Sequence, residues 1–252
     1  SLKGVSVLYN TCWVRLNHAL VTHADAVRNT ITLFEAAKKA GVERIVHISI
    51  TNPENDLGLE YFEGKALLES TLKQTGLSYA IIRPAVIFGR EDILINNIAW
   101  GLRRVPVFGI FGKGDYKLQP NYVEDLADLA VQYGEIREDC TINAIGPESF
   151  EYVELVRDIR KAIGANSLLL NMPPWLGYLA ARIVSLFVND IFLTREEIHG
   201  LIGNTLSVDK DPTGSTKLSE WINDNKQSLG YRYASELGRR TDRTRAYWIT
   251  PA

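Results

Sequence analysis

Residues 44–84 constrain the fold of this chain more than any other stretch. Residues 44–50 are a short run of mostly β-branched and apolar side chains, which predicts a strand buried on both faces of a parallel sheet. After Asn52-Pro53 a polar loop leads into a helical pattern that stops at Gly76, and a second apolar run over residues 78–82 returns to the sheet. This order of strand, helix and strand indicates an α/β fold.

The helix of this stretch carries two polar side chains on its inward face. Four residues share that face by their spacing: Tyr61, Lys65, Leu68 and Leu72. A tyrosine and a lysine one turn apart can form a proton-transfer site, because a nearby ammonium group lowers the pKa of the phenol from about 10. The hydroxyl groups of Ser49 and Thr51, at the end of the preceding strand, can hold a substrate oxygen.

A purely structural explanation of the same spacing stays open. In that interpretation Lys65 pairs with Glu69 on a solvated helix face, and Tyr61 packs as an amphipathic core residue. A Tyr-x-x-x-Lys spacing alone favours this explanation, since such spacings often arise by chance. The order of strand, hydroxyl, helix, strand and Arg83-Pro84 is more specific.

This order resembles the short-chain dehydrogenase/reductase superfamily in its extended and atypical forms. The likeness extends over roughly residues 4–165 and includes four further segments, residues 26–51, 81–97, 119–131 and 142–150. The segment RPAVIFGRED at 83–92, together with Gln119-Pro120, is most similar to the atypical branch that includes the NAD(P)H-binding accessory subunit of respiratory complex I.

The resemblance implies a doubly wound, parallel, Rossmann-like sheet within residues 1–165, with NAD or NADP as the cofactor. It implies that Tyr61 is the acid/base, that Lys65 lowers the pKa of Tyr61 and holds the nicotinamide ribose, and that Thr51 or Ser49 orients the substrate oxygen. The residues that would contact the cofactor are Asn10, Thr11, Ser49, Tyr61, Lys65, Arg83, Pro84, Ala85 and Val86. For Asn10 and Thr11, an Asx-type turn that ends the strand is an equal alternative.

The sequence contains no Gly-x-x-Gly-x-x-Gly turn, which in the superfamily receives the dinucleotide pyrophosphate at the start of a helix. Residues 4–10 resemble the fourth strand of the fold instead. We therefore expect the first three strands and their helices to be missing from the sequence, which would be the C-terminal part of a longer protein.

Beyond this core, residues 85–120 are expected to leave the sheet as a cap insertion, and residues 166–252 to form a mostly helical cap and tail. Gly109, Gly112 and Gly114 predict a hairpin turn and not a phosphate loop, because no helix follows them. The apolar residues 173–188 are too few to span a bilayer. A core helix is the default interpretation, and a pocket wall or a helix on a membrane or protein partner are the alternatives.

Composition restricts the classes of ligand and partner that this chain is expected to bind. A net charge of −2 and a pI near 6.1 give neither the basic footprint of a nucleic-acid-binding protein nor that of a protein bound to an anionic membrane. Cys12 and Cys140 fit no metal or redox spacing and are interpreted as two buried free thiols in a reducing cytoplasm. The four histidines match no zinc pattern, so no metal is expected.

Two functions of different classes follow. The first is an NAD(P)-dependent oxidoreductase or epimerase that couples proton transfer by Tyr61 and Lys65 to hydride transfer on a small carbonyl or alcohol substrate, with the apolar residues 173–188 favouring an apolar one. The second, implied by the complex I resemblance, is a non-catalytic NAD(P)H-binding accessory subunit or assembly factor.

Overall fold

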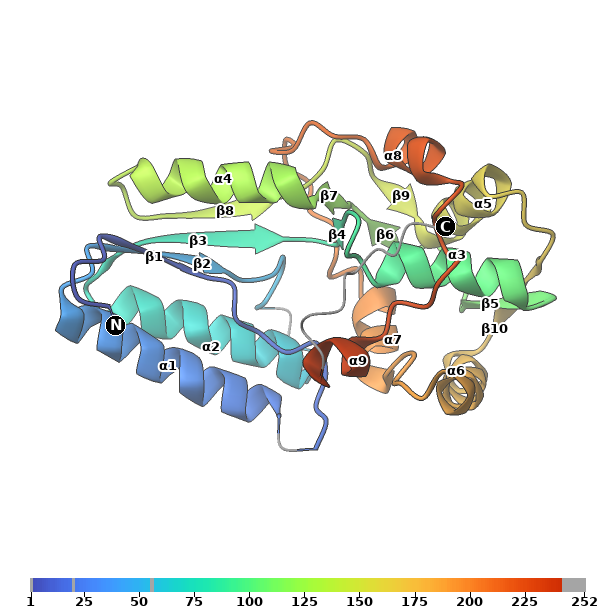
Figure 1. The fold of residues 1–252 in the computed structure, drawn as a ribbon, viewed down its shortest axis with the longest axis horizontal. Helices are drawn as coiled ribbons and strands as arrows, with labels where there is room; N and C mark the ends of the chain where they lie inside the picture. The colour runs from blue at the N-terminus through green and yellow to red at the C-terminus, as the bar shows by residue number, and fades with distance from the viewer. Residues whose placement is uncertain (1, 20, 55–56, 242–252) are drawn as a thin grey trace.

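A four-stranded parallel sheet organises the amino-terminal half of the chain (Figure 1). The computed structural model describes residues 2–19, 21–54 and 57–241. The strands of the sheet, in spatial order, are β1 (Val7–Asn10), β2 (Arg44–Ile48), β3 (Ser78–Pro84) and β8 (Cys140–Ala144). Every pair of neighbours is parallel, and helices cover both faces, which confirms the predicted doubly wound α/β architecture.

Helices α1 (His23–Ala40) and α2 (Glu60–Gln74) cover one face of this sheet. Helix α1 begins at a capping box in which Thr22 and Asp25 satisfy each other's backbone N–H groups, and it ends at Gly41 in the left-handed conformation. The core on this side joins both helices to β2 and β3 through Phe34, Ala37, Val42, Ile45, Leu68, Leu72 and Ile81.

Helix α4 (Val123–Glu135) covers the opposite face, where Leu126 packs with Val46, Ala80, Ile82 and Ala144. Side chains of β2 therefore enter the core on both sides, since Ile45 faces α1 and α2 while Val46 faces α4. This confirms the prediction that residues 44–50 contain a doubly buried strand.

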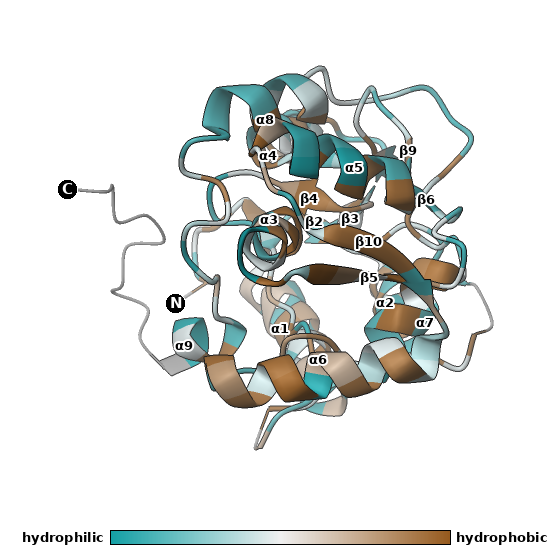
Figure 2. Cartoon of the chain, turned by 90° about the vertical axis from the view of Figure 1, so that its right-hand side faces the viewer, coloured by the Kyte–Doolittle hydropathy of each residue, from teal (hydrophilic) through white to brown (hydrophobic). Residues whose placement is uncertain are grey.

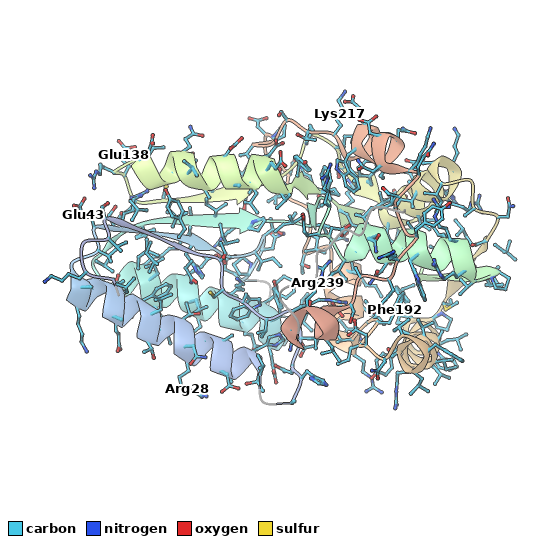
Figure 3. All side chains as sticks on the ribbon, in the orientation of Figure 1. Arg28, Glu43, Glu138, Phe192, Lys217 and Arg239 are labelled. Carbon is cyan, nitrogen blue, oxygen red and sulfur yellow. The ribbon has the colours of Figure 1, made fainter. Side chains whose placement is uncertain are left out.

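The remaining elements form a second region at the carboxyl ends of the strands, here called the cap region (residues 85–122 and 146–241). Its strands are β4 (Ile87–Phe88), β5 (Val107–Phe111), β6 (Lys117–Leu118), β7 (Asn121–Tyr122), β9 (Phe150–Glu151) and β10 (Leu168–Met172). Its helices are α3 (Leu94–Arg104), α5 (Tyr152–Ala162), α6 (Pro174–Val188), α7 (Arg195–Ile202), α8 (Leu218–Asn225) and α9 (Glu236–Thr241). Glu43 and Glu138 mark the far end of the sheet, whereas Phe192 and Arg239 lie in the cap region (Figure 3).

The predicted hairpin around Gly109–Gly114 is wrong. Strand β5 pairs in parallel with β10, and β6 pairs antiparallel with β9, so the two strands that flank these glycines do not pair with each other. The pairing brings the side chain of Met172 on β10 over Gly109, where a Cβ would lie 2.5 Å from it.

The prediction of core packing for residues 173–188 is also wrong. Helix α6 buries only Gly177 and Ala181, and most of its large apolar side chains are exposed. Among the described residues, no helix is both long enough and apolar enough to cross a bilayer. Figure 2 shows apolar residues along α6 at the edge of the molecule.

The two cysteines are free, as expected, but Cys12 is exposed and Cys140 is half-buried. Cys12 lies on the irregular segment that follows β1, beyond the buried part of the strand, which explains why the prediction of burial fails there.

Replacing Gly146 with alanine is expected to lower the free energy of unfolding by at least about 2 kcal/mol. A Cβ on Gly146 would lie 1.8 Å from the backbone oxygen of Pro120, so two backbone segments must separate. Gly200→Ala in α7 is the matched control, because its Cβ would make ordinary contacts of 3.4 Å and longer, and alanine favours a helix by about 1 kcal/mol. Urea unfolding of both variants measures the difference, and equal stability of Gly146→Ala and wild type would contradict the expectation.

Candidate active site

Three neighbouring strands deliver polar residues to one edge of the sheet. In the register of the sheet Asn10 lies opposite His47, and Ile48 lies opposite Ile82, so Asn10, Ser49 and Arg83 all lie near the carboxyl edge. This edge faces the cap region (Figure 1). In doubly wound folds, ligands bind at the carboxyl ends of the strands.

Lys65 lies buried beneath an aromatic ring beside this edge. Lys65 is only 3% exposed. Its Nζ donates a hydrogen bond to the backbone oxygen of Ile48 at 2.7 Å and lies 4.5 Å from the centroid of the Trp13 ring. Burial lowers the pKa of Lys65 to about 7, against the opposing effect of the Glu69 carboxylate. Lys65 is therefore not the solvated partner of Glu69 that the structural explanation of the motif assumed, since Glu69 is buried as well.

Tyr61 belongs to an aromatic cluster with Trp13 and His23. Its ring meets both of theirs edge-on, at centroid distances of 5.5 and 5.6 Å, and Trp13 stacks on His23. Burial raises the pKa of the Tyr61 phenol, Glu197 raises it further, and Arg15 opposes them. The expectation that Lys65 lowers this pKa is not met here, because desolvation is the largest effect. The phenol is protonated at neutral pH and can donate a proton.

Ser49 takes part in a buried polar network. Its hydroxyl donates to Oε1 of Glu69 at 2.5 Å, and Nε of Arg83 donates to the same oxygen at 2.9 Å. Arg83 also pairs with Glu54. Burial opposes the charge on Arg83, but the carboxylates of Glu69 and Glu54 overcome it and raise the pKa of the guanidinium. The network ties α2 to the ends of β2 and β3.

The hydroxyl of Thr51 is also held by the protein, since it donates to the backbone oxygen of Thr205 at 2.9 Å. The Thr51 backbone N–H donates to the oxygen of Pro84 at 2.9 Å. Thr51 is fully buried, so these bonds connect the end of β2 to β3 and to the cap region.

Asn10 ends β1 in an Asx-type turn, which was the alternative to contact with the cofactor. Its Oδ1 accepts the backbone N–H of Cys12 at 3.2 Å, and its Nδ2 lies 2.9 Å from Nδ1 of His47. Thr11 is exposed beside it. Both polar atoms of the Asn10 side chain thus have protein partners.

A cavity of about 820 Å³ lies between the sheet edge and the cap region. Tyr61, Ala85 and Val86 are on its wall, and most of the remaining lining is apolar, including Ile50, Leu59, Phe62, Phe88, Ile98, Phe111, Val184 and Leu201. Its volume is within the range of small-molecule sites, which are lined mainly by apolar groups with a few polar ones. The sheet and the cap region together can enclose an apolar molecule next to the Tyr61 ring.

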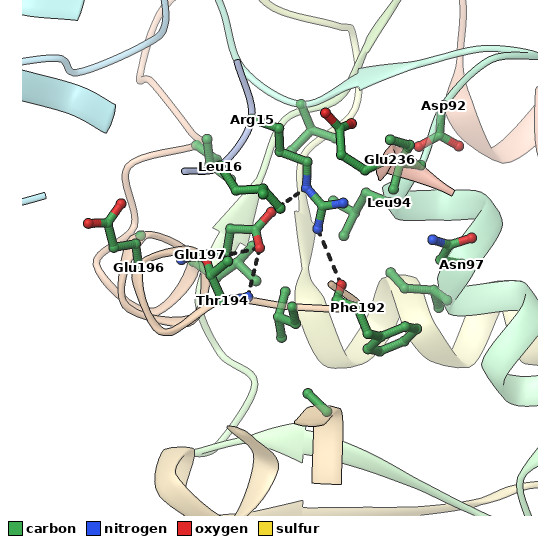
Figure 4. A pocket seen from close by; sticks show the side chains of 18 of the residues that line it. Arg15, Leu16, Asp92, Leu94, Asn97, Phe192, Thr194, Glu196, Glu197 and Glu236 are labelled. Carbon is green, nitrogen blue, oxygen red and sulfur yellow. Dashed lines mark hydrogen bonds and ion pairs between the residues drawn. The ribbon is translucent and has the colours of Figure 1, made fainter. Parts of the chain in front are cut away.

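One corner of the cavity is polar (Figure 4). Nε of Arg15 pairs with Glu197 at 2.5 Å, and its Nη2 donates to the backbone oxygen of Phe192 at 3.2 Å. Burial opposes the charge on Arg15, but Glu197 overcomes it and raises the pKa of the guanidinium. Asp92, also on the cavity wall, has its pKa raised to about 7 by burial, although backbone N–H groups from Ile95 and Asn96 stabilise the carboxylate.

Sequence reasoning missed Trp13, Arg15 and Glu197. Trp13 and Arg15 come from the segment between β1 and α1, which has neither helical nor strand periodicity. Glu197 has the spacing of a capping-box partner of Thr194, and the structure shows that capping box at the start of α7. A tryptophan and an arginine close together in an irregular segment were the available signal.

Comparisons with known proteins bring the sequence and the fold together. No family model matches the chain. Over 96 residues it is 38% identical to subunit 9 of the NADH dehydrogenase [ubiquinone] 1 alpha subcomplex from Mus musculus, a stretch that covers 37% of this chain and 25% of that protein. Over 141 residues it is 26% identical to the NADH-ubiquinone oxidoreductase 40 kDa subunit of Neurospora crassa, covering 55% of this chain and 36% of that protein.

Solved structures match over most of the chain. An NADPH-dependent quinone oxidoreductase from Escherichia coli, complexed with NADPH, superposes with a TM-score of 0.69 at 21% identity, covering 88% of this chain and 77% of that one. A triphenylmethane reductase from Citrobacter sp. superposes with a TM-score of 0.70 at 15% identity, covering 90% and 78%. These matches confirm the fold that the resemblance to the atypical short-chain dehydrogenase/reductases implies. At these identities the structural matches establish the fold, and the matched stretch spans about a quarter of the mouse protein.

The side chains around Lys65 show whether this chain could hold a nicotinamide dinucleotide. The indole Nε1 of Trp13 is buried and, within residues 2–19, 21–54 and 57–241, has no hydrogen-bond partner. Lys65 uses one of its N–H groups on Ile48, so further donors exist here for a hydroxyl-bearing ribose. The residues fit the nicotinamide ribose, provided that the Trp13 ring shifts from the ammonium group that it covers. The sequence offers no glycine-rich turn for the pyrophosphate.

Proposed function

We propose that the protein to which this chain belongs is an NAD(P)H-dependent oxidoreductase that reduces an apolar carbonyl compound. The observation that carries the proposal is the position of Tyr61, a protonated phenol on the wall of an apolar cavity of about 820 Å³, with Lys65 one helical turn away. The raised pKa keeps the phenol protonated, so a proton is present for transfer to a carbonyl oxygen, although it makes the phenol a weaker acid than free tyrosine.

Each part of the chain then has a chemical task. When bound, the nicotinamide supplies the hydride. Tyr61 donates its phenolic proton to the oxygen of the carbonyl group, and Lys65 and Tyr61 would hold the ribose hydroxyls. The apolar cavity wall excludes water and positions the hydrocarbon part of the substrate, while Arg15 and Glu197 give one corner a fixed polarity.

The full-length protein is expected to bind NADPH or NADH in the micromolar range that is common for substrates of enzymes. Titrating each nucleotide with purified full-length protein and following nicotinamide fluorescence measures this. Lys65→Met should weaken binding at least about tenfold, since charge-assisted hydrogen bonds contribute roughly 1.5–3 kcal/mol. The exposed Lys73 of the same helix provides the control Lys73→Met. Unchanged fluorescence with both nucleotides would refute dinucleotide binding.

A second function, a non-catalytic accessory subunit, is favoured by the hydrogen bonds of Ser49 and Thr51. Both hydroxyls donate to protein acceptors, Glu69 and the backbone oxygen of Thr205, so neither is available to orient a substrate oxygen in this arrangement. The sequence match to a subunit of the mouse NADH dehydrogenase supports the same function. In this case NAD(P)H would stabilise the fold, and surfaces of the cap region would contact neighbouring subunits.

The two functions predict different behaviour of the tagged protein on native gels and in activity assays of cell extracts. An accessory subunit should migrate with a large assembly on native gels, and its Tyr61→Phe variant should assemble normally. An enzyme should migrate alone or as a small oligomer and oxidise NAD(P)H in the presence of apolar aldehydes, ketones or quinones.

A further inference from the structure

The large apolar side chains of helix α6 face outward, whereas those of a core helix face inward. Six large apolar residues of this helix are exposed: Trp175, Leu176, Leu179, Ile183, Leu186 and Phe187. Leu186 and Phe187 are 83% and 85% exposed. The buried face consists of Gly177 and Ala181, and it packs so closely that a Cβ on Gly177 would lie 2.2 Å from the Phe111 ring. Such a concentration of exposed apolar surface marks an interaction site.

The shape and the local charge of this surface, and not the net charge of −2 of the chain, indicate its partner. The exposed side chains belong to one helix, which lies at the margin of the molecule in Figure 2, and they form a ridge with no acidic residue between 174 and 188. Arg182 is on the helix itself, and the exposed Arg195 lies over the ring of Tyr178 at 4.8 Å. Apolar side chains bordered by arginines, with a tryptophan near one end, are typical of helices that lie in the interface of an anionic bilayer.

We propose that α6 docks this protein on the surface of an anionic lipid membrane, with Leu186 and Phe187 inserted among the acyl chains. At 15 residues, or roughly 22 Å, the helix lies in the interface and does not span it. A ridge of projecting side chains inserts into a fluid phase without needing a complementary groove, which a folded partner would have to provide.

The inner face of the same helix lines the cavity. Gly177, Ala180, Ala181 and Val184 are on the cavity wall, so a single helix separates the proposed membrane surface from the candidate active site. If the proposed function holds, a lipid-soluble carbonyl compound has a short path from the bilayer to Tyr61. The docking itself does not depend on that function.

Vesicle flotation tests the docking with the full chain. The wild-type protein should float with vesicles of phosphatidylcholine and phosphatidylglycerol, and the double variant Leu186→Glu, Phe187→Glu should lose at least about tenfold in partitioning, because two buried apolar contacts are replaced by charges. The matched control is Leu67→Glu with Val131→Glu, two exposed apolar residues on α2 and α4, and it should float like wild type. Thermal unfolding by circular dichroism shows that each variant is folded.

Three results would overturn the proposal. In the first, the wild-type protein stays at the bottom of the gradient. In the second, the control variant loses as much binding as the α6 variant. In the third, light scattering finds a dimer that the α6 variant converts to a monomer while neither form floats, which would make this face an interface between two copies. NADPH titration of the α6 variant separates docking from the proposed function, since neither substituted residue lines the cavity.

Discussion

Replacing Tyr61 with phenylalanine is expected to lower kcat for carbonyl reduction by about 10²- to 10⁴-fold, the usual contribution of a positioned proton donor. Phenylalanine keeps the ring and hence the edge-on contacts with Trp13 and His23, so the aromatic cluster and the cavity wall should persist. The variant loses only the hydroxyl group. Its Kd for NADPH should therefore change by no more than a few-fold, which places the loss in the chemical step.

The measurement is the oxidation of NADPH, followed by absorbance, with apolar aldehydes, ketones and quinones as trial substrates. Tyr79→Phe is the matched control, because Tyr79 lies near the amino end of β3, away from the cavity, and removal of its hydroxyl should leave kcat unchanged. Equal turnover by Tyr61→Phe and wild type would exclude Tyr61 as the proton donor and would favour the accessory-subunit function.

The sequence predicted the central part of the fold because local and tertiary preferences agree there. The run at 44–50 is β-branched and apolar, and it lies between two helical layers, so its pattern and its burial have the same cause. Helices α1 and α7 start at capping boxes, which depend on residues three positions apart and are visible without the structure.

The cap region was less predictable because its pairings join distant segments. Strands β5 and β10 are separated by more than fifty residues, and no local pattern reports that Met172 lies against Gly109. Helix α6 is apolar all round, which normally indicates burial. Only the structure reveals that its small residues face inward and its large ones face outward.

The sequence pattern predicted that Tyr61 and Lys65 lie near each other, and it did not predict the electrostatics of the two groups. The spacing of Tyr61 and Lys65 correctly places both on one side of α2, but a spacing does not report desolvation. Burial dominates both groups, raising the pKa of the phenol and lowering the pKa of the amine. The ring of Trp13, from a segment without periodicity, contributes to this burial, so the electrostatics depend on a contact that the sequence pattern did not indicate.

Burial of Lys65 should make the stability of the protein rise with pH in alkaline solution. The pKa of Lys65 is about 7 in the folded state and ordinarily 10.5 for a lysine side chain, so between these values the unfolded chain binds more protons than the folded one. The contribution of Lys65 to stability therefore increases as pH rises from about 7 towards 10.5, while near and above pH 9 tyrosines such as Tyr61 and Tyr152, whose pKa values burial raises, oppose it. Two other buried groups change the stability mainly at lower pH. Burial lowers the pKa of His47 from 6.5 to about 3, so His47 affects stability only below about pH 6.5. Burial raises the pKa of Asp92 from 3.8 to about 7, so Asp92 affects stability mainly below about pH 7.

The contribution of Lys65 to the free energy of unfolding is thus expected to rise by about 2.5 kcal/mol between about pH 7.5 and 9.5. Urea unfolding of wild type and of Lys65→Met at a series of pH values measures it as the difference between the two slopes. Lys65→Met replaces the amine by an apolar group of similar length, so it should lose this part of the slope and should be more stable near pH 7.5. Lys73→Met, on the exposed part of α2, should retain the wild-type slope. A wild-type slope in Lys65→Met would mean that the amine is well solvated, and the Trp13 ring would then not cover it in solution.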